Sequence, residues 1–410
     1  MTAQKPLNVL VTSEAWQSAL ACIQSFGRRG HRVYLLSLDS PSLHAKSQFV
    51  AGVARYPHRD TLDGLAEAVF RLVEANGIDL VVPISDDDAL IAARINELFP
   101  PASRTSGPRF VTGSGEATRL VRSRNRTIEL CRQLGIRTPA TEFTDLAGLA
   151  AACEKIGFPC FLKVSGTMAS QGVIPLHSAA EIGRVAATLP ADSELQVQEP
   201  VFGDFVDATG YCESGRVVAA FGFRAAYDMS AGGTPAHATR CDDPEVLRVL
   251  GSLAEALEWT GGIDVDLLAT PDGGHAVLEI NPRLSGTVIF GQKRGLDLAA
   301  GYLPGEESPA SPDLPGLDPQ ATGFVSLAEE AHFIARGGAA ARERAEQFRR
   351  EHRCVDNAFA DDPGYSQALA SQIERVVGYV ERNPVKAGLC VAPEQWRFSS
   401  AHTRPPRLDD

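Results

Sequence analysis

The sequence lacks the patterns that mark several large classes of protein. No apolar run approaches the roughly 20 residues that a helix needs to cross a bilayer, and the first residues do not form a signal peptide pattern. The eight cysteines form no C-x-x-C pair, and the nine histidines show no H-x-x-x-H or H-E-x-x-H spacing. These absences predict a reduced, cytoplasmic protein without a disulfide framework or a zinc site.

Two common nucleotide-binding loops are also missing. The sequence has no G-x-x-x-x-G-K-[ST] and no G-x-G-x-x-G after its first predicted strand. A formal net charge of −12 argues against a general nucleic-acid surface. No Ser/His/Asp or Cys/His arrangement indicates a nucleophilic enzyme. What remains is a chain of 410 residues, 44% of them hydrophobic, which is enough for two or three domains with real cores.

Alternating apolar strands and amphipathic helices predict an α/β fold for the first part of the chain. The predicted strands span 7–12, 31–38 and 80–84, and the predicted helices span 16–27 and 62–76. This order predicts a parallel sheet in residues 1–105.

A predicted hairpin over residues 261–287 carries the strongest candidate site. Two apolar runs flank a Thr-Pro-Asp-Gly-Gly turn, which is typical of a hairpin. Glu279, Asn281 and Arg283 are spaced two apart, so they point the same way. Asp266 comes opposite them in a hairpin register. Carboxylate and amide oxygens suit Mg²⁺, and a guanidinium binds phosphate in a bidentate manner. The alternative is that the acids are solvated charges at a sheet edge.

The stretch LEINPRLSGT in this hairpin resembles the C-terminal signature of the ATP-grasp superfamily. The resemblance covers about residues 5–300. It implies a Rossmann-like domain over 1–105, followed by a two-subdomain ATP-grasp domain over 106–300 with its lid at about 140–195. It also implies ATP and Mg²⁺, with Mn²⁺ as the other ion. In this interpretation Asp266, Glu279 and Asn281 hold the metal and Arg283 contacts the phosphates.

Two further cations are assigned by the same resemblance. Lys163 ends a predicted apolar strand before a small-residue loop over 165–172, as in the family's lid, where a lysine reaches the phosphates. A predicted helix over 117–134 resembles the family helix that usually contains Asp-Lys. Here Ser123 and Arg124 take those positions, and Arg124 is the candidate phosphate cation. The alternative is a solvated arginine-rich helix face.

The end of a predicted strand over 194–201 resembles the hinge between the two subdomains. The backbone of Glu199, Pro200 and Val201 is expected to pair with adenine. Asp204 is the first candidate for the ribose hydroxyls and Asp207 the second. An ordinary surface turn is the alternative.

A long irregular stretch over 225–240 resembles the loop near the acceptor substrate. Long loops are often functional. Arg224 and Arg240 are candidates to hold a substrate carboxylate or an acyl phosphate, and solvated surface arginines are the alternative.

After residue 300 the resemblance ends. Residues 301–360 are expected to form a Pro-rich linker, over 303–318, and a helix, over 333–350. Residues 361–410 contain YVERNPVKAGL, which resembles the tail of transposases associated with repetitive extragenic palindromes. Tyr379 falls where that family has its nucleophile. No His-x-His pair accompanies it, so neither transposase chemistry nor nucleic-acid binding is expected.

The ATP-grasp resemblance implies an ADP-forming ligase that activates a carboxylate as an acyl phosphate and joins it to an amine. Its catalytic residues would be Arg283, Lys163, Arg240 and Arg224. Its partners would be a small-molecule acid, such as an amino acid, and an amine, with no membrane. A homodimer is left open. The alternative is a nucleotide-binding relative without turnover, because Ser123-Arg124 and a glycine-poor lid loop depart from the family pattern.

Overall fold

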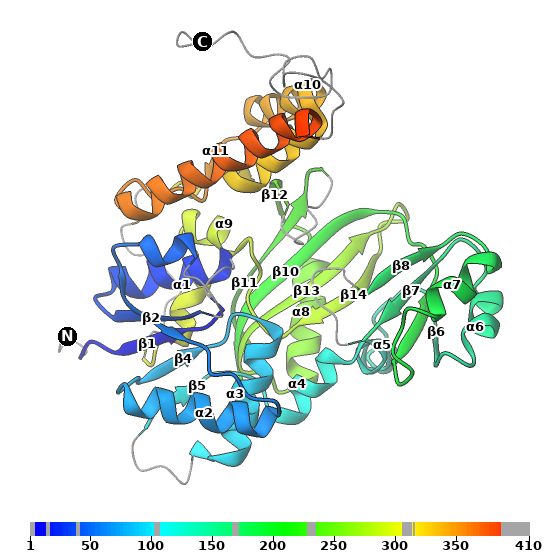
Figure 1. Cartoon of the computed structure of the whole chain (residues 1–410), viewed down its shortest axis with the longest axis horizontal. Helices are drawn as coiled ribbons and strands as arrows, with labels where there is room; N and C mark the ends of the chain where they lie inside the picture. Colours follow the sequence, from blue (N-terminus) through cyan, green and yellow to red (C-terminus); the bar gives the residue numbers. More distant parts are fainter. Residues whose placement is uncertain are drawn as a thin grey trace.

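The computed structural model describes most of the chain up to residue 386 (Figure 1). The described residues are 5–13, 17–37, 42–101, 107–165, 172–227, 235–305, 314 and 316–386, the side chains of 377–386 excepted. The lid loop expected over 165–172 therefore lies largely outside the described residues, as do the side chain of Tyr379 and all of 387–410. None of the described helices is long and apolar enough to cross a membrane.

The N-terminal unit is a parallel five-stranded sheet with helices on both faces, as the alternating pattern predicts. The strand order is β3-β2-β1-β4-β5. The strands are β1 (Asn8–Val11), β2 (Arg32–Ser37), β3 (Val50–Arg55), β4 (Leu80–Val82) and β5 (Arg109–Phe110). The helices are α1 (Gln17–Arg28), α2 (Leu62–Ala75), α3 (Asp86–Leu98) and the short 3₁₀ turn η1 (Leu43–Lys46). Because β5 belongs to this sheet, the unit extends past residue 105.

The helix predicted over 117–134 is two helices, α4 (Gly115–Arg122) and α5 (Arg124–Gln133). Ser123 separates them with an extended backbone, and its hydroxyl oxygen accepts a hydrogen bond from the backbone N–H of Arg126. Serine is a preferred N-cap because its side chain satisfies an amide that the helix leaves unpaired. The continuous prediction was wrong here, and the break turns Arg124 inward, where it is 6% exposed.

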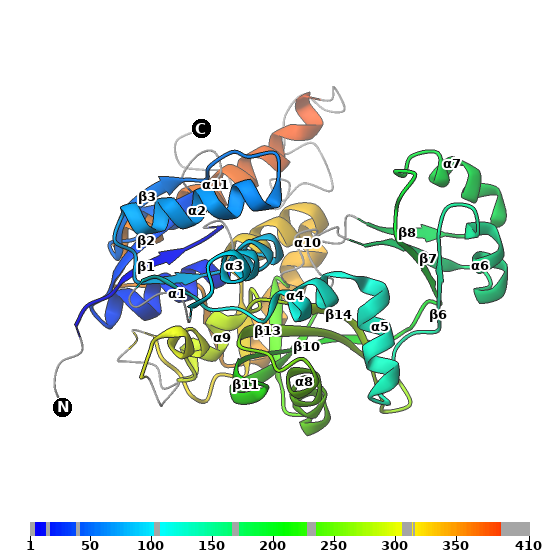
Figure 2. The same ribbon diagram turned by 90° about the horizontal axis from the view of Figure 1, so that it is seen from below.

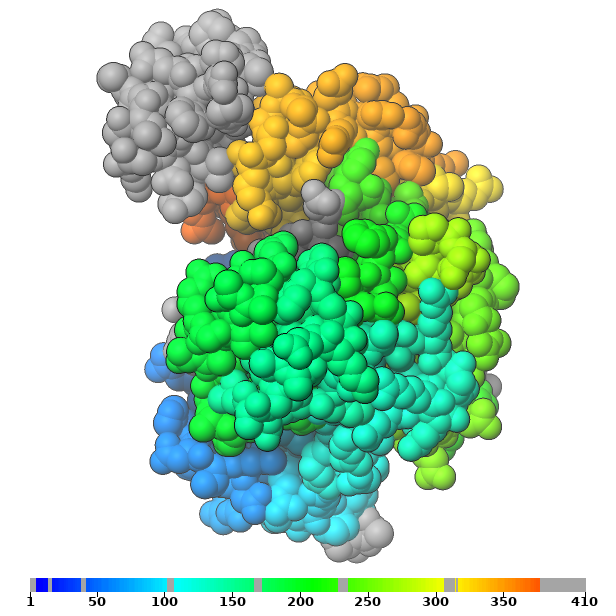
Figure 3. Space-filling view, turned by 90° about the vertical axis from the view of Figure 1, so that its right-hand side faces the viewer, coloured from blue at the N-terminus to red at the C-terminus, as the bar shows by residue number. Residues whose placement is uncertain are grey.

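A smaller unit projects from the rest of the molecule in Figure 2 and corresponds to the expected lid. Its antiparallel sheet has the order β6-β9-β7-β8. Its elements are β6 (Thr141–Thr144), α6 (Leu149–Ile156), β7 (Cys160–Val164), β8 (Val173–Leu176), η3 (Ala179–Glu181), α7 (Ile182–Ala186) and β9 (Leu195–Gln198). It has a core of its own, built around Leu149, Leu162 and Val197. In the space-filling view this lobe faces the reader, between the N-terminal unit and the C-terminal helices (Figure 3).

The largest sheet has seven strands in the order β14-β13-β10-β11-β12-β15-β16. The strands are β10 (Asp204–Glu213), β11 (Arg216–Ala225), β12 (His237–Cys241), β13 (Gly261–Ala269), β14 (His275–Asn281), β15 (Gly323–Val325) and β16 (Cys354–Asp356). Helix α8 (Pro244–Ala256) covers one face, where alternate residues such as Val206 and Val265 are buried. The end of the loop expected over 225–240 is strand β12, so that expectation was wrong for residues 237–240.

One hydrophobic core joins the N-terminal unit to the opposite face of this sheet. It contains Val9 and Ile23 from β1 and α1, Phe223 from β11, and Phe290 and Leu298 from the segment after β14. That segment forms α9 (Val288–Lys293) and η4 (Leu298–Tyr302). Leu303 and Leu314, from the stretch expected to be a linker, are buried in the same core.

The C-terminal part is helical, as expected, and packs on the rest of the chain. Helix α10 (Leu327–Glu351) is kinked at Gly338, and it packs against α11 (Pro363–Lys386). The buried carboxylate of Asp362 fixes the start of α11. It accepts hydrogen bonds from Gln24 and Ser47 of the N-terminal unit, at 2.7 Å from Gln24 Nε2. The C-terminal helices are therefore anchored to the first strand–helix units of the chain.

Candidate active site

The hairpin β13–β14 places its polar side chains on the sheet face opposite α8. Asp266 is paired with Glu279 in the antiparallel register, and Asp264 is paired with Asn281. Residues directly opposite each other in such a pair share a face. The hairpin therefore brings together the three residues that the sequence analysis assigned to a metal, Asp266, Glu279 and Asn281, and adds Asp264 beside them.

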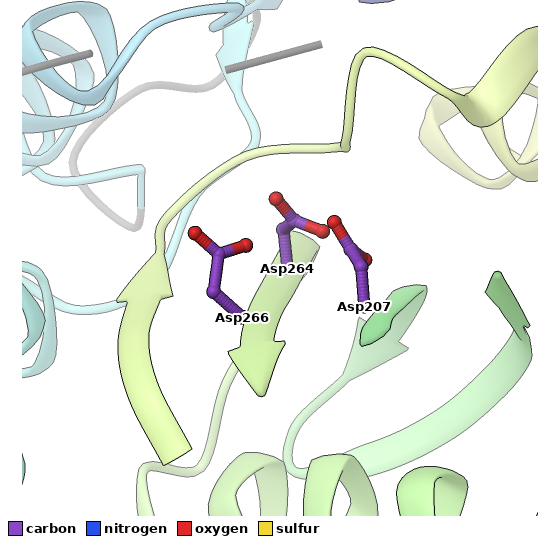
Figure 4. A group of neighbouring side chains, drawn as sticks. All are labelled: Asp207, Asp264 and Asp266. Carbon is purple, nitrogen blue, oxygen red and sulfur yellow. The ribbon is translucent and has the colours of Figure 1, made fainter. Parts of the chain in front are cut away.

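Strand β10 adds a further carboxylate to this face. Asp207 lies opposite Asp266, and Thr209 lies opposite Asp264. One carboxylate oxygen from each of Asp207, Asp264 and Asp266 lies within 4.8 Å of the others. Figure 4 shows the three groups pointing to the same side of the sheet. Asp207, the second candidate for the ribose hydroxyls, lies in this acidic cluster.

The three carboxyl groups of the cluster are destabilised as anions. Burial and the neighbouring charge of Asp264 raise the pKa of Asp207 well above its ordinary value. Burial, with repulsion from Asp264 and Glu279, raises the pKa of Asp266 well above its ordinary value. Burial also raises the pKa of Asp264. Like charges in a desolvated place favour protonation or a bound cation, so this set of oxygen donors fits a cation.

Arg283 connects the cluster to the N-terminal unit. Its Nη1 lies 3.1 Å from Asp264 Oδ2, and its Nε lies 3.4 Å from Asp86 Oδ1. Asp86 is the first residue of α3, which begins after a short turn that follows β4. The carboxyl ends of parallel strands are a usual place for ligands in such sheets. The N-terminal unit therefore supplies one wall of the site.

Two cations face the hairpin from the other side. Arg124 Nη1 lies 3.5 Å from Glu279 Oε2. Lys163, at the end of β7 in the lid, is 8% exposed and interacts electrostatically with Arg124, Glu279 and Asp266. Burial and then the charge of Arg124 lower the pKa of Lys163 to about 8. The structure thus brings Lys163, Arg124 and the metal candidates into one place.

The hinge residues lie between the lid and β10. Glu199 is tied to the lid sheet, since its backbone N–H donates to Ala140 O and its Oε1 accepts from Ala140 N at 2.8 Å. Pro200 and Val201 are half-buried, and Phe202 beside them is 77% exposed.

The remaining predicted residues are not brought to the cluster. Asp204 forms an ion pair of 2.6 Å with Arg224, and alternation along β10 puts both on the face opposite Asp207. They line a separate cavity of about 280 Å³ with His275. Arg240, on β12, pairs with Asp242.

A larger cavity of about 600 Å³ opens beside the lid. It is lined by Ser165 and Glu194 of the lid and by Arg119, Arg122 and Ser123 of α4 and its end. Ser123 Oγ donates to Glu194 Oε1 at 2.7 Å. This cavity lies between the lid and the end of α4.

A lid that carries a buried lysine, set against a sheet that carries oxygen ligands and an arginine, has the architecture of the ATP-grasp fold. The comparisons with solved structures find the same overall fold. No protein-family model matches the sequence, and no curated protein is a significant match to it.

Three solved structures illustrate the likeness. One is the biotin carboxylase domain of the Hydrogenobacter thermophilus 2-oxoglutarate carboxylase, solved with MgADP and bicarbonate. The match covers 73% of this chain and 69% of that domain's chain, at 14% identity and a TM-score of 0.58. N5-carboxyaminoimidazole synthase from Aspergillus clavatus, with ADP and 5-aminoimidazole ribonucleotide, matches 83% of this chain and 86% of its own, at 16% identity and a TM-score of 0.57. The match to L-amino acid ligase from Bacillus licheniformis covers 78% of this chain and 79% of the ligase, at 16% identity and a TM-score of 0.57. At these identities the likeness shows that the fold is shared.

Sequence reasoning missed the grouping of Asp207, Asp264 and Asp86 around Arg283. Asp264 was visible as a charge inside an apolar strand, a position that is costly for a charged residue. Asp207 has the same signal, since it follows Val206 and precedes Ala208. Nothing local indicated that β10 pairs with β13 or that α3 begins beside Arg283.

Proposed function

We propose that this protein is an ATP-dependent, ADP-forming ligase that joins a small-molecule carboxylate to an amine. The observation that carries the proposal is the meeting of Lys163 and Arg124 with Asp266 and Glu279. Three different parts of the chain supply these residues: the lid, α5 and the hairpin β13–β14. Positively and negatively charged side chains lie side by side there. Such an arrangement suits a triphosphate and a divalent cation, which need cations and oxygen donors side by side.

Each part of the site has a distinct task in this proposal. Asp266, Glu279 and Asn281 would hold Mg²⁺, which supplies charge neutralisation on the ATP phosphates. Lys163, Arg124 and Arg283 bind and orient phosphate oxygens and stabilise the charge on the phosphoryl group as it moves. The lid covers the site and excludes water, which would otherwise hydrolyse an activated acid.

The reaction balances without a redox partner or a protein nucleophile. The substrate carboxylate attacks the γ-phosphorus, and the bond to ADP breaks. The amine then attacks the carbonyl carbon of the acyl phosphate, and phosphate leaves with the bonding electron pair. For an ammonium substrate the overall products are ADP, phosphate, an amide and one proton.

The proposal also specifies the metal ion, the residues that contact the nucleotide and the substrate, and the domain limits. Mg²⁺ is the expected ion, and Mn²⁺ is expected to replace it. Glu199, Pro200 and Val201 are proposed to contact adenine, Asp204 a ribose, and Arg224 and Arg240 an anionic substrate group. The domain limits at 300 and 360, a cytoplasmic location and a homodimer belong to the same proposal. The limit expected at 105 falls later, because β5 belongs to the first sheet.

The test is ADP release from MgATP over a panel of amino acid pairs, with the product confirmed by mass spectrometry. Release that requires both an acid and an amine supports the ligase. MgATP binding by calorimetry, without ADP release for any pair, would instead indicate a nucleotide-binding relative without turnover.

A further inference from the structure

We propose that Asp207 and Asp264 form a binding site for the ammonium group of the acceptor amine. This inference rests on the proposed ligase function and names the chemistry of its second substrate. Both side chains are only 2% exposed. The Oδ1 atom of each is buried and has no hydrogen-bond partner among the described residues. Both atoms can accept from a cationic donor outside the chain, which would replace the proton that the two carboxyl groups otherwise share.

The other oxygen of each carboxylate is already used by the protein. Ser285 Oγ donates to Asp207 Oδ2 at 3.2 Å. Asn281 Nδ2 and Arg283 Nη1 both donate to Asp264 Oδ2, at 3.3 and 3.1 Å. These contacts fix the orientation of both groups and leave one acceptor on each. The site is therefore built around a pair of free acceptors.

Hydroxyl groups complete the lining. Ser285 Oγ lies 3.0 Å from Thr287 Oγ1, and Thr209 Oγ1 accepts a hydrogen bond from Ser285 N at 3.0 Å. Ser285 and the two threonines are all buried. Carboxylate and hydroxyl oxygens match the three N–H donors of an ammonium group, which has no acceptor of its own.

An ammonium fits this pair better than a second divalent metal. Mg²⁺ requires an octahedron of oxygen ligands, whereas each carboxylate here offers a single free oxygen. The guanidinium of Arg283 in contact with Asp264 also repels a doubly charged ion. A monovalent cation faces half that repulsion. The adjacent Asp266 belongs to the proposed metal site, so an amine held here would lie next to the activated acid.

The kinetic test compares two nucleophiles in wild-type protein and in the Asp207→Asn variant. One is the amine identified by the ADP-release panel, which is cationic at neutral pH. The other is hydroxylamine, which is neutral and reports the acyl phosphate as a hydroxamate. We expect the ratio of kcat/KM for the amine to that for hydroxylamine to fall at least about 30-fold in the variant. Glu213→Gln, at the exposed end of β10 and outside the site, is the control and should leave the ratio unchanged. An unchanged ratio in Asp207→Asn would overturn the proposal.

A binding test separates this inference from the ligase assignment. Methylammonium chloride is expected to raise the Tm of the wild-type protein more than tetramethylammonium chloride at equal ionic strength, and Asp207→Asn is expected to remove the difference. This result would support the site even if no acid–amine pair released ADP. Titration with Mn²⁺, followed by electron paramagnetic resonance, should give equal ion stoichiometry in wild type and Asp207→Asn. Loss of one Mn²⁺ ion would show a metal site instead, and equal stabilisation by both ammonium salts would also overturn the proposal.

Discussion

Asp207 on β10 lies directly opposite Asp266 on β13, so two strands far apart in the sequence place their carboxyl groups on one face of the sheet. Burial and mutual repulsion raise the pKa of both groups. The folded protein therefore binds more protons than the unfolded chain above the ordinary carboxyl pKa. It follows that this cluster lowers stability as pH rises through the raised folded-state values.

We accordingly predict that the metal-free protein loses stability as pH rises above the ordinary carboxyl pKa, and that Asp207→Asn weakens this dependence. The variant should have a higher free energy of unfolding than wild type at the higher pH, because it lacks the buried negative charge of Asp207. Urea titrations at several pH values would measure this. Asp204→Asn, at an exposed carboxylate on the same strand, should keep the wild-type dependence. A variant that is less stable than wild type at all pH values would contradict the prediction.

Glu279→Gln should abolish most of the ATP-dependent reaction. The amide keeps the size of the side chain but removes the charge that faces Arg124 and the proposed metal ion. We expect kcat for ADP release to fall at least about 100-fold, with a circular dichroism spectrum and Tm close to wild type. Glu213→Gln, at the exposed end of β10, is the matched control. Full activity in Glu279→Gln would remove the metal assignment.

Lys163→Met should weaken MgATP binding by about 10- to 100-fold, because a buried charge-assisted contact is lost. The ammonium of Lys163 has a pKa near 8 in the free protein, and phosphate nearby raises it. MgATP binding should therefore take up a proton above about pH 8 and very little at pH 7.

Calorimetry in two buffers of different ionisation enthalpy measures this uptake. It should vanish in Lys163→Met and persist in Lys155→Met, where the replaced lysine is an exposed partner of Glu142 in the same lid. Proton uptake that is the same in Lys163→Met and wild type would assign the effect to another group.

Asp362→Ala should destabilise the whole protein. The buried carboxylate accepts hydrogen bonds from Gln24, Ser47 and the backbone of Gln48, and its loss leaves these donors unsatisfied. We expect a loss of about 2–4 kcal/mol in free energy of unfolding. Glu346→Ala, at an exposed carboxylate on α10, should cost less than about 0.5 kcal/mol. Equal effects of the two changes would show that Asp362 does not anchor α11.

Much of the fold follows from local patterns in the sequence. Apolar strands such as 80–84 and the amphipathic helix over 62–76 are decided by short-range periodicity, and the structure has them. The break at Ser123 was not predicted because both flanking segments favour helix, and only the cap and the contact with Glu194 reveal it. Strand β5 has only two residues, too few for an alternation, and β3 (VAGVAR) has only two strongly apolar residues among its six.

Some residues of the candidate site could likewise be grouped from local spacing, and others could not. Asp266, Glu279 and Asn281 lie in one hairpin, so the spacing within it was enough to group them. The position of Asp207 depends on which strand pairs with β10, and that of Asp86 depends on how α3 meets the large sheet. Both are long-range outcomes of packing. Asp204 and Asp207 also differ by three positions, which reverses their faces, and sequence alone could not choose between them.

The shared core has a consequence for how this chain is made. The apolar face of α1 packs against α9 and η4, and Gln24 in α1 bonds to Asp362. During synthesis from the N-terminus, that face stays uncovered until most of the polypeptide has left the ribosome. Uncovered apolar surface in a large nascent chain promotes aggregation. The protein should therefore depend on chaperones early in translation, and ribosome-bound fragments that end before α9 should be recovered in complex with them.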